Sequence, residues 1–132
     1  HVTGNVGLSG QDQVDIAPVN ASLTIYMAGG GFSTSGNAGL NNLSKNPLAL
    51  ALYGLPTCTG INLGGNAAFS GSIYAPQADL SLGGGGNNTY DFVGASISKT
   101  VTMNGHFNFH YDENIARVGP SRGYVATSWA EK

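Results

Sequence analysis

The stretch HFNFHYDEN, residues 106–114, is the densest cluster of side chains that could do chemistry. His106 and His110 would suit a metal site on a helix, where residues four apart are neighbours. Aromatic and polar residues alternate along the stretch, however, which predicts a strand with the aromatics on one face. On a strand about 13 Å separates the two histidines, at about 3.3 Å per residue. We therefore expect a polar outer face here and no metal site.

Two adjacent carboxylates, Asp112 and Glu113, raise the question of glycoside hydrolysis. A glycosidase needs two carboxyl groups that converge across a cleft. Neighbouring residues of a strand point to opposite faces, so this pair does not converge. We interpret both, together with His110, as a structural cap where the fold ends. Their carboxylates would accept backbone N–H groups or pair with Arg117 or Arg122.

Other catalytic motifs are incomplete. The run GGGG at 83–86 lacks the Lys-Ser/Thr that completes a phosphate-binding loop. None of Ser9, Ser70 and Ser72 has the context of a nucleophile elbow. We expect no catalytic residue and no cofactor, and hence a protein that is not an enzyme.

The composition narrows the function classes further. Charged residues make up 9% of the chain, against about 25% in an average protein. The five basic residues form no patch, so we expect no binding of nucleic acid through its phosphates. No apolar run reaches the roughly 20 residues of a membrane-spanning helix, so we expect no membrane contact by this segment. A polar but nearly uncharged surface favours an extracellular protein.

The single cysteine, Cys58, cannot form an internal disulfide. It is either buried as a small hydrophobe or paired between chains, and the surrounding stretch LPTCTGI favours burial. Because the sequence begins with His1 rather than Met, we expect a processed or excised chain, with any signal or anchor upstream.

Short runs of alternating apolar and polar residues, closed by Gly, Asn or Pro, recur along the chain and predict strands. The run LALALYG at 48–54 alternates in the same way, so we favour a strand there over a helix that starts at Asn46 and Pro47. The other predicted strands are 21–27, 60–63, 78–82, 100–103, 107–111 and 123–129.

Two segments have nearly the same text, FSGSIYAPQADLSL at 69–82 and FVGASISKTVTM at 92–103. Their first phenylalanines are 23 residues apart, and the apolar pairs 61/63, 80/82 and 101/103 follow at spacings of 19 and 21. Such repeats of short strands and sharp corners are typical of a solenoid. We predict an all-β fold, a parallel β-solenoid of about 20–23 residues per coil, as a single domain over 1–132. A β-sandwich is the alternative.

The repeat also predicts which residues stack on one another in successive coils. Leu63, Leu82 and Met103 would form one inward ladder, and Phe69 and Phe92 another. The aromatics of 107–111 would lie inside and cap the last coil.

Three tyrosines, Tyr26, Tyr53 and Tyr74, each lie beside a residue expected to point inward. If they stack on one face of the solenoid they form an aromatic ladder. Such a ladder suits sugar rings or the surface of another protein. The alternatives are that the tyrosines belong to the core or lie under a loop.

Three stretches, YGLPTC (53–58), GSIYAPQADLSLGG (71–84) and YDFVGASISKTVTMNGHFNFHYDE (90–113), carry a family resemblance. They resemble an uncharacterised bacterial cell-envelope domain that follows pilin-like or pilus-assembly-like anchors. The resemblance implies a right-handed parallel β-helix-like fold and an exported protein. It implies no catalytic residue, because none is known for that family.

Together these observations favour a structural or interaction module of a bacterial surface assembly, a pilus-like or filament subunit or tip. The strand edges at the two ends of a short solenoid must be covered or used for association. Residues 1–20 and 117–132 would then serve as caps or assembly arms. The partners of this module would be copies of itself or other envelope proteins. A carbohydrate-binding or adhesive domain that holds surface polysaccharide on a Tyr/Asn face is the alternative.

Overall fold

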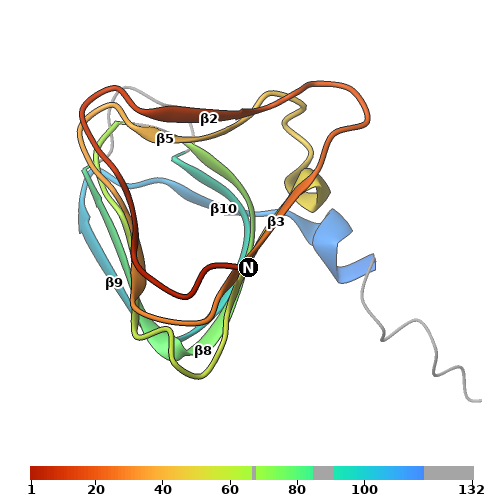
Figure 1. The fold of residues 1–132 in the computed structure, drawn as a ribbon. Coiled ribbons are helices and arrows are strands. Elements are labelled where there is room, and N and C mark those ends of the chain that lie inside the picture. The colour runs from red at the N-terminus through yellow and green to blue at the C-terminus, as the bar shows by residue number, and fades with distance from the viewer. Residues whose placement is uncertain (67, 85–90, 118–132) are drawn as a thin grey trace, which may run out of the picture.

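The computed structural model describes residues 1–66, 68–84 and 91–117 and is all-β (Figure 1). Ten strands and two 3-10 turns, η1 (Pro47–Ala49) and η2 (Glu113–Arg117), make up the regular structure of these residues. None of the described residues belongs to a helix long and apolar enough to cross a membrane. The strands are β1 (Val6–Leu8), β2 (Gln13–Ile16), β3 (Leu23–Met27), β4 (Gly31–Thr34), β5 (Gly39–Asn42), β6 (Leu50–Gly54), β7 (Gly60–Leu63), β8 (Phe69–Gly84), β9 (Phe92–Gly105) and β10 (Phe109–Tyr111).

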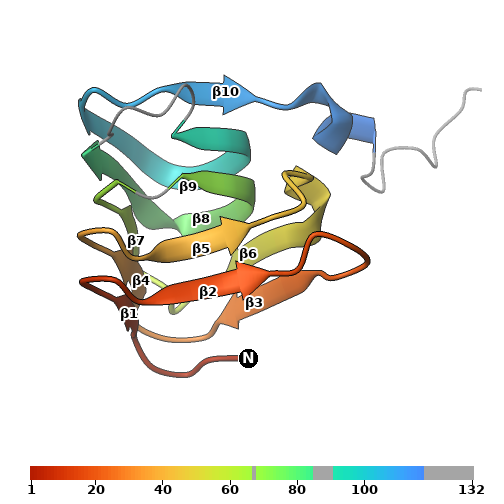
Figure 2. The same cartoon turned by 90° about the horizontal axis from the view of Figure 1, so that it is seen from above.

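The strands wind into a solenoid of roughly triangular cross-section (Figure 1), whose coils stack from the N-terminus at one end to β10 at the other (Figure 2). Face 1 consists of β1, β4, β7, 79–82 of β8 and 100–103 of β9. Face 2 consists of β2, β5, 69–71 of β8, 92–94 of β9 and β10. Face 3 consists of β3, β6, 72–74 of β8 and 95–97 of β9.

Every strand pair in the described residues is parallel. This confirms the predicted β-solenoid and excludes the β-sandwich, whose sheets are antiparallel. The two segments of similar text lie side by side, with Phe69 opposite Phe92 and Leu82 opposite Met103. Leu63 lies opposite Leu82 on the other side, so the predicted inward ladder is confirmed.

The coil length is not constant along the axis. Later coils have the predicted spacing, since Ile61 is paired with Leu80 and Leu80 with Val101. Earlier coils are longer, with Val6 opposite Phe32 and Phe32 opposite Ile61, 26 and 29 residues apart. The extra residues lie in the corners, such as 17–22 and 43–49, whereas β8 and β9 turn their corners while remaining extended. The length of the corners, rather than that of the strands, therefore sets the number of residues per coil.

The stretch LALALYG divides between the two structures considered for it. Pro47–Ala49 form η1, and the Asn46 side chain caps it by accepting from the Leu48 backbone N–H at 3.1 Å. Leu50 onward is β6, with Leu50 and Leu52 fully buried. The strand prediction holds for 50–54, and the capping signal marks the turn that precedes it.

The N-terminal segment 1–20 forms the first coil of the solenoid. Its β1 pairs with β4 and its β2 pairs with β5, while Val2 bridges to Met27 on face 3. The segment therefore covers the core from that end by lengthening the solenoid. The other predicted arm, 117–132, and the predicted strand at 123–129 lie outside the described residues beyond Arg117.

The interior is filled by apolar side chains from all three faces. A buried amide, Asn42, closes the corner after β5, where its Nδ2 donates to the carbonyls of Asn46 at 2.6 Å and Ser70 at 3.0 Å. Its Oδ1 accepts from the Ser44 hydroxyl, so the buried amide is fully paired, as buried polar groups require. The core residues are Ile16, Met27, Phe32, Leu40, Leu50, Leu52, Cys58, Ile61, Leu63, Phe69, Ile73, Ala75, Ala78, Leu80, Leu82 and Phe92.

Cys58 is a free thiol in this core, completely shielded from solvent. Of the two alternatives for this residue, the structure shows burial, since a shielded sulfur cannot reach another chain. Burial raises the pKa of the Cys58 thiol above its ordinary value of 9.0, because the thiolate would lose its hydration.

Alkaline solution is expected to destabilise the fold through Cys58. The unfolded thiol ionises near its ordinary pKa, whereas the folded thiol stays neutral to higher pH, so the free energy of unfolding falls as pH rises above about 9. Urea unfolding at pH 7 and pH 10 measures the fall, and Cys58→Ala should lessen it. An equal fall in the variant would contradict this assignment.

Candidate functional site

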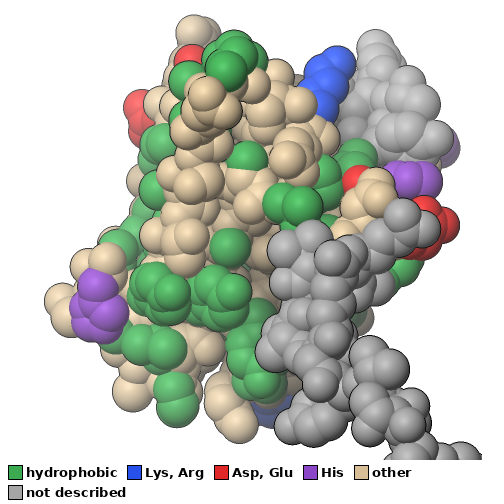
Figure 3. Space-filling view, turned by 90° about the vertical axis from the view of Figure 1, so that its right-hand side faces the viewer, with side chains coloured by type: hydrophobic (Ala, Val, Ile, Leu, Met, Phe, Trp, Pro, Cys, Tyr) green, Lys and Arg blue, Asp and Glu red, His purple; other side chains and the backbone are tan. Residues whose placement is uncertain are grey.

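The three predicted tyrosines form a ladder on the outside of face 3. Tyr26 lies opposite Tyr53, and Tyr53 opposite Tyr74. Their side chains are 38% to 49% exposed, and the next coil continues the row with exposed Ile97. Figure 3 looks onto this side of the molecule, where hydrophobic and uncharged polar side chains cover most of the described surface. The ladder is therefore a surface feature and not part of the core.

The ring geometry limits what the ladder can bind. The rings of Tyr26 and Tyr53 are stacked, with centroids 5.2 Å apart and planes 13° apart. The rings of Tyr53 and Tyr74 are tilted by 54° at 6.3 Å. Stacking covers one face of Tyr26 and one face of Tyr53, whereas Tyr74 is only tilted against its neighbour and is the most exposed of the three. A sugar ring, which packs on an open aromatic face, therefore has its best access at Tyr74.

Face 1 carries a hollow of about 430 Å³ on its surface. Two polar groups at its margin already have structural partners. Asn5 Oδ1 accepts from the Gly31 N–H at 2.9 Å, and Asp79 Oδ1 accepts from the Thr100 hydroxyl at 2.6 Å. The residues that line it are Asn5, Val6, Gly7, Gly31, Phe32, Ser33, Gly60, Ile61, Asn62, Asp79 and Ser81. The hollow results from small side chains on the outside of face 1.

The C-terminal end of the solenoid exposes residues that point into its interior. Val101 and Met103 lie opposite Leu80 and Leu82, which are buried in the preceding coil. In the last coil, however, Val101 is 52% exposed and Met103 is 55% exposed. Phe109 on β10 is likewise exposed on one side while its ring stacks on Phe92, with centroids 4.5 Å apart. Within the described residues, no further coil covers the core at this end.

At the same end, the described residues leave one edge of each outermost strand without a partner strand. Within the described residues, β10 pairs only with 92–94 of β9, and 95–105 of β9 pair only with β8. The outer edges of both segments therefore present N–H and C=O groups, which template the addition of another strand. We name this surface, made of 95–105 of β9 and of β10 with the inward side chains Val101, Met103 and Phe109, the open end.

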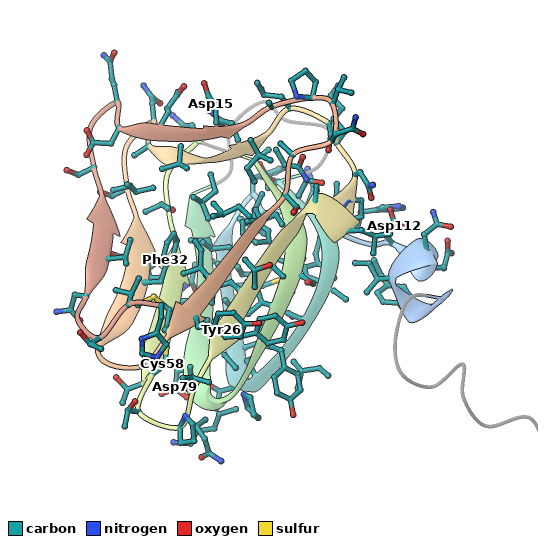
Figure 4. All side chains as sticks on the ribbon, turned by 45° about the vertical axis from the view of Figure 1, so that its right-hand side comes forward. Asp15, Tyr26, Phe32, Cys58, Asp79 and Asp112 are labelled. Atoms are coloured by element: carbon teal, nitrogen blue, oxygen red, sulfur yellow. The ribbon has the colours of Figure 1, made fainter. Side chains whose placement is uncertain are left out.

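The residues of the predicted structural cap lie next to the open end, in β10 and at the start of η2. The Asp112 N–H donates to the Gly94 carbonyl at 3.1 Å, and Asp112 Oδ1 accepts from the Asn114 N–H at 2.9 Å. Asp112 thus lies directly before η2, at the corner where face 2 passes into face 3 (Figure 4). The predicted bond from its carboxylate to a backbone N–H is confirmed. His110 and Glu113 are exposed. Pairing with Arg117 or Arg122 falls outside the described side chains.

Two of the three aromatics of 107–111 pack on the core, and the third does not. Phe107 packs against the core and Phe109 stacks on Phe92, as predicted. Tyr111 pairs with Gly94 and is exposed, because no strand in the described residues lies over it. No three His, Cys, Asp or Glu side chains among these residues are grouped so as to hold a metal ion.

A family model described as a domain of unknown function, DUF7305, matches residues 1–118. The chain belongs to the DUF7305 family. The matched residues include every coil of the described solenoid. No curated protein and no solved structure matches the chain significantly.

Sequence reasoning located the tyrosines of this DUF7305 domain and expected strand edges at the two ends of the solenoid, but it missed the exposed inward side chains of the open end. The alternation of Val101 and Met103 correctly indicated inward side chains. It could not indicate whether a further coil covers them. The signal that was present is the end of the repeat itself, because no third copy of the text comes after 92–103.

Proposed function

We propose that this domain is a non-catalytic structural and interaction module of a bacterial extracellular surface assembly, a pilus-like or filament subunit or tip. The observation that carries the proposal is the open end, where inward apolar side chains coincide with a strand edge that no described strand pairs with. Covering Val101, Met103 and Phe109 removes apolar surface from water, which is favourable by about 25 cal/mol per Å². A strand added at the same place would also form hydrogen bonds with the backbone N–H and C=O groups of this edge.

The composition of the open end supports association. Natural edge strands are usually protected by charged residues, proline or a covering loop. The exposed length of β9, 95–105, contains one charged residue, Lys99, and no proline. A low overall charge leaves little electrostatic repulsion between copies. The exported location is inferred from the same composition and from the resemblance to envelope domains.

Met103→Lys is expected to weaken self-association of the purified chain strongly. The ammonium would have to be buried between two apolar surfaces, so the dissociation constant should rise at least about tenfold, or about 1.4 kcal/mol. Sedimentation velocity over a concentration series measures the change. Thr102→Lys is the matched control, because Thr102 lies opposite Ser81 on the outer side of the same strand. Equal weakening by both variants, or by neither, would contradict the proposal.

A carbohydrate-binding or adhesive role is the second candidate, supported by the exposed tyrosine ladder on face 3. On this proposal Tyr74→Ala should remove binding to surface polysaccharide on a glycan array, whereas Tyr74→Phe keeps the ring and should retain it. Tyr74 is chosen because its ring is the least covered by stacking. A wild-type chain that binds no glycan on the array would rule this candidate out.

A further inference from the structure

We infer that the partner of the open end is the N-terminal coil of a second copy of this chain, added head to tail. In this arrangement β1 and β2 of one copy extend faces 1 and 2 of the next, beyond β9 and β10. The inference rests on the proposed function, because it specifies the occupant of the same surface.

The inward ladders of face 1 fit this arrangement. One ladder runs Val6, Phe32, Ile61, Leu80, Val101, and the other runs Leu8, Thr34, Leu63, Leu82, Met103. A second copy placed in register would set its Val6 beside Val101 and its Leu8 beside Met103. Val6 and Leu8 are only half-buried in the first coil. Both ladders would then continue with apolar residues across the junction.

Strand direction favours head-to-tail addition over contact between two open ends. All strand pairs in the described residues are parallel, and a copy shifted along the solenoid axis keeps that direction. Two open ends related by a two-fold axis would instead meet with antiparallel strands, and Val101 and Met103 would lose their register. A head-to-tail contact is heterologous, so each added copy exposes a new open end and the assembly does not close.

The polar side chains around the edges of the two ends, here called the rims, are also compatible in charge. The first coil carries Asp12 at the corner before β2 and Asp15 on the outer side of β2 (Figure 4). The last coil carries His106 at the equivalent corner and His110 on β10. The contact would therefore place carboxylates beside imidazoles and not beside other carboxylates.

The acidic residues that follow β10 do not oppose this contact. Asp112 and Glu113 lie at the corner after β10, and the matching corner of the first coil, 17–22, contains no acidic residue. On face 3 the first coil contributes only the bridge at Val2. We therefore expect pairing between copies on faces 1 and 2 only.

Two variants that block opposite ends test the inference. Leu8→Lys blocks the N-terminal end and Met103→Lys blocks the open end, and each should stay monomeric alone, with association at least tenfold weaker than in the wild type. Mixed, they should form a 1:1 dimer that grows no further, because one intact end of each kind remains. Sedimentation velocity with a mass tag on one variant identifies the mixed species. Thermal melts confirm that each is folded, and Val6→Lys replaces Leu8→Lys if that variant does not fold.

The other outcomes separate the inference from the function on which it rests. If Leu8→Lys alone associates as the wild type does, the open end binds something other than the N-terminal coil, and the inference is overturned while the proposed function stands. If the mixture forms no dimer while the wild type associates, the inference is also overturned. If Met103→Lys alone associates as the wild type does, or the wild type is monomeric at every concentration, the proposed function itself is wrong.

Discussion

Gly94→Ala should destabilise the fold more than any other small substitution considered for this protein. The Cβ of an alanine here would lie 1.8 Å from the backbone oxygen of Gly71, and Gly94 has a φ of +146°, which side chains rarely adopt. Gly71 and Gly94 are paired where the chain passes from face 2 to face 3. Because the obstacle is backbone, the strands must separate, and we expect a loss of about 3 kcal/mol or more.

Gly83→Ala is the control for Gly94→Ala in the neighbouring strand β8. Nothing lies within 4 Å of a Cβ built at Gly83. We expect a change in the free energy of unfolding of about 0.5 kcal/mol or less, as for an ordinary surface substitution. Urea unfolding of the two variants measures the difference. Similar losses in both would mean that the close approach of Gly71 and Gly94 is not a constraint on the fold.

Phe92→Ala has the second large expected effect, about 3–5 kcal/mol of stability lost through a cavity in the core. Phe92 is fully buried, and its ring stacks between Phe69, at a centroid distance of 5.0 Å, and Phe109, at 4.5 Å. Truncation would remove both contacts and leave a void between successive coils. Phe92→Leu keeps part of the volume and should cost less.

Phe109→Ala provides the comparison within the same ladder. Its ring touches Phe92 on one side and is open to solvent on the other. Its removal should therefore cost about half as much or less, roughly 1–2 kcal/mol, because less apolar area is re-exposed. Thermal or urea unfolding of the two variants tests this gradient. If Phe109→Ala cost as much as Phe92→Ala, the open end would already be covered in the isolated chain.

The sequence predicts the later coils well for a physical reason. Stacked coils place equivalent residues in contact, as Phe69 with Phe92 and Leu82 with Met103. Such pairs must match in size and spacing, so the amino-acid sequence repeats. The same constraint predicted the tyrosine ladder, because inward and outward residues alternate on a strand.

The first coils were harder to predict because their corners differ. Val6, Phe32 and Ile61 occupy one ladder, yet 26 and 29 residues separate them, so no constant spacing reveals them. The hollow on face 1 depends on small side chains such as Gly7 and Ser33, which have no repeated pattern. The open end depends on whether another coil stacks on β9, a property that alternation within a strand does not encode.

Electron microscopy of the purified wild-type chain at high concentration tests the central claim most directly. The described part of face 1 contains five stacked strand segments. At about 4.8 Å per strand, a copy advances about 24 Å along the axis. We predict unbranched filaments with that axial repeat. Separate particles of single-domain size at every concentration would contradict an assembly built through the open end.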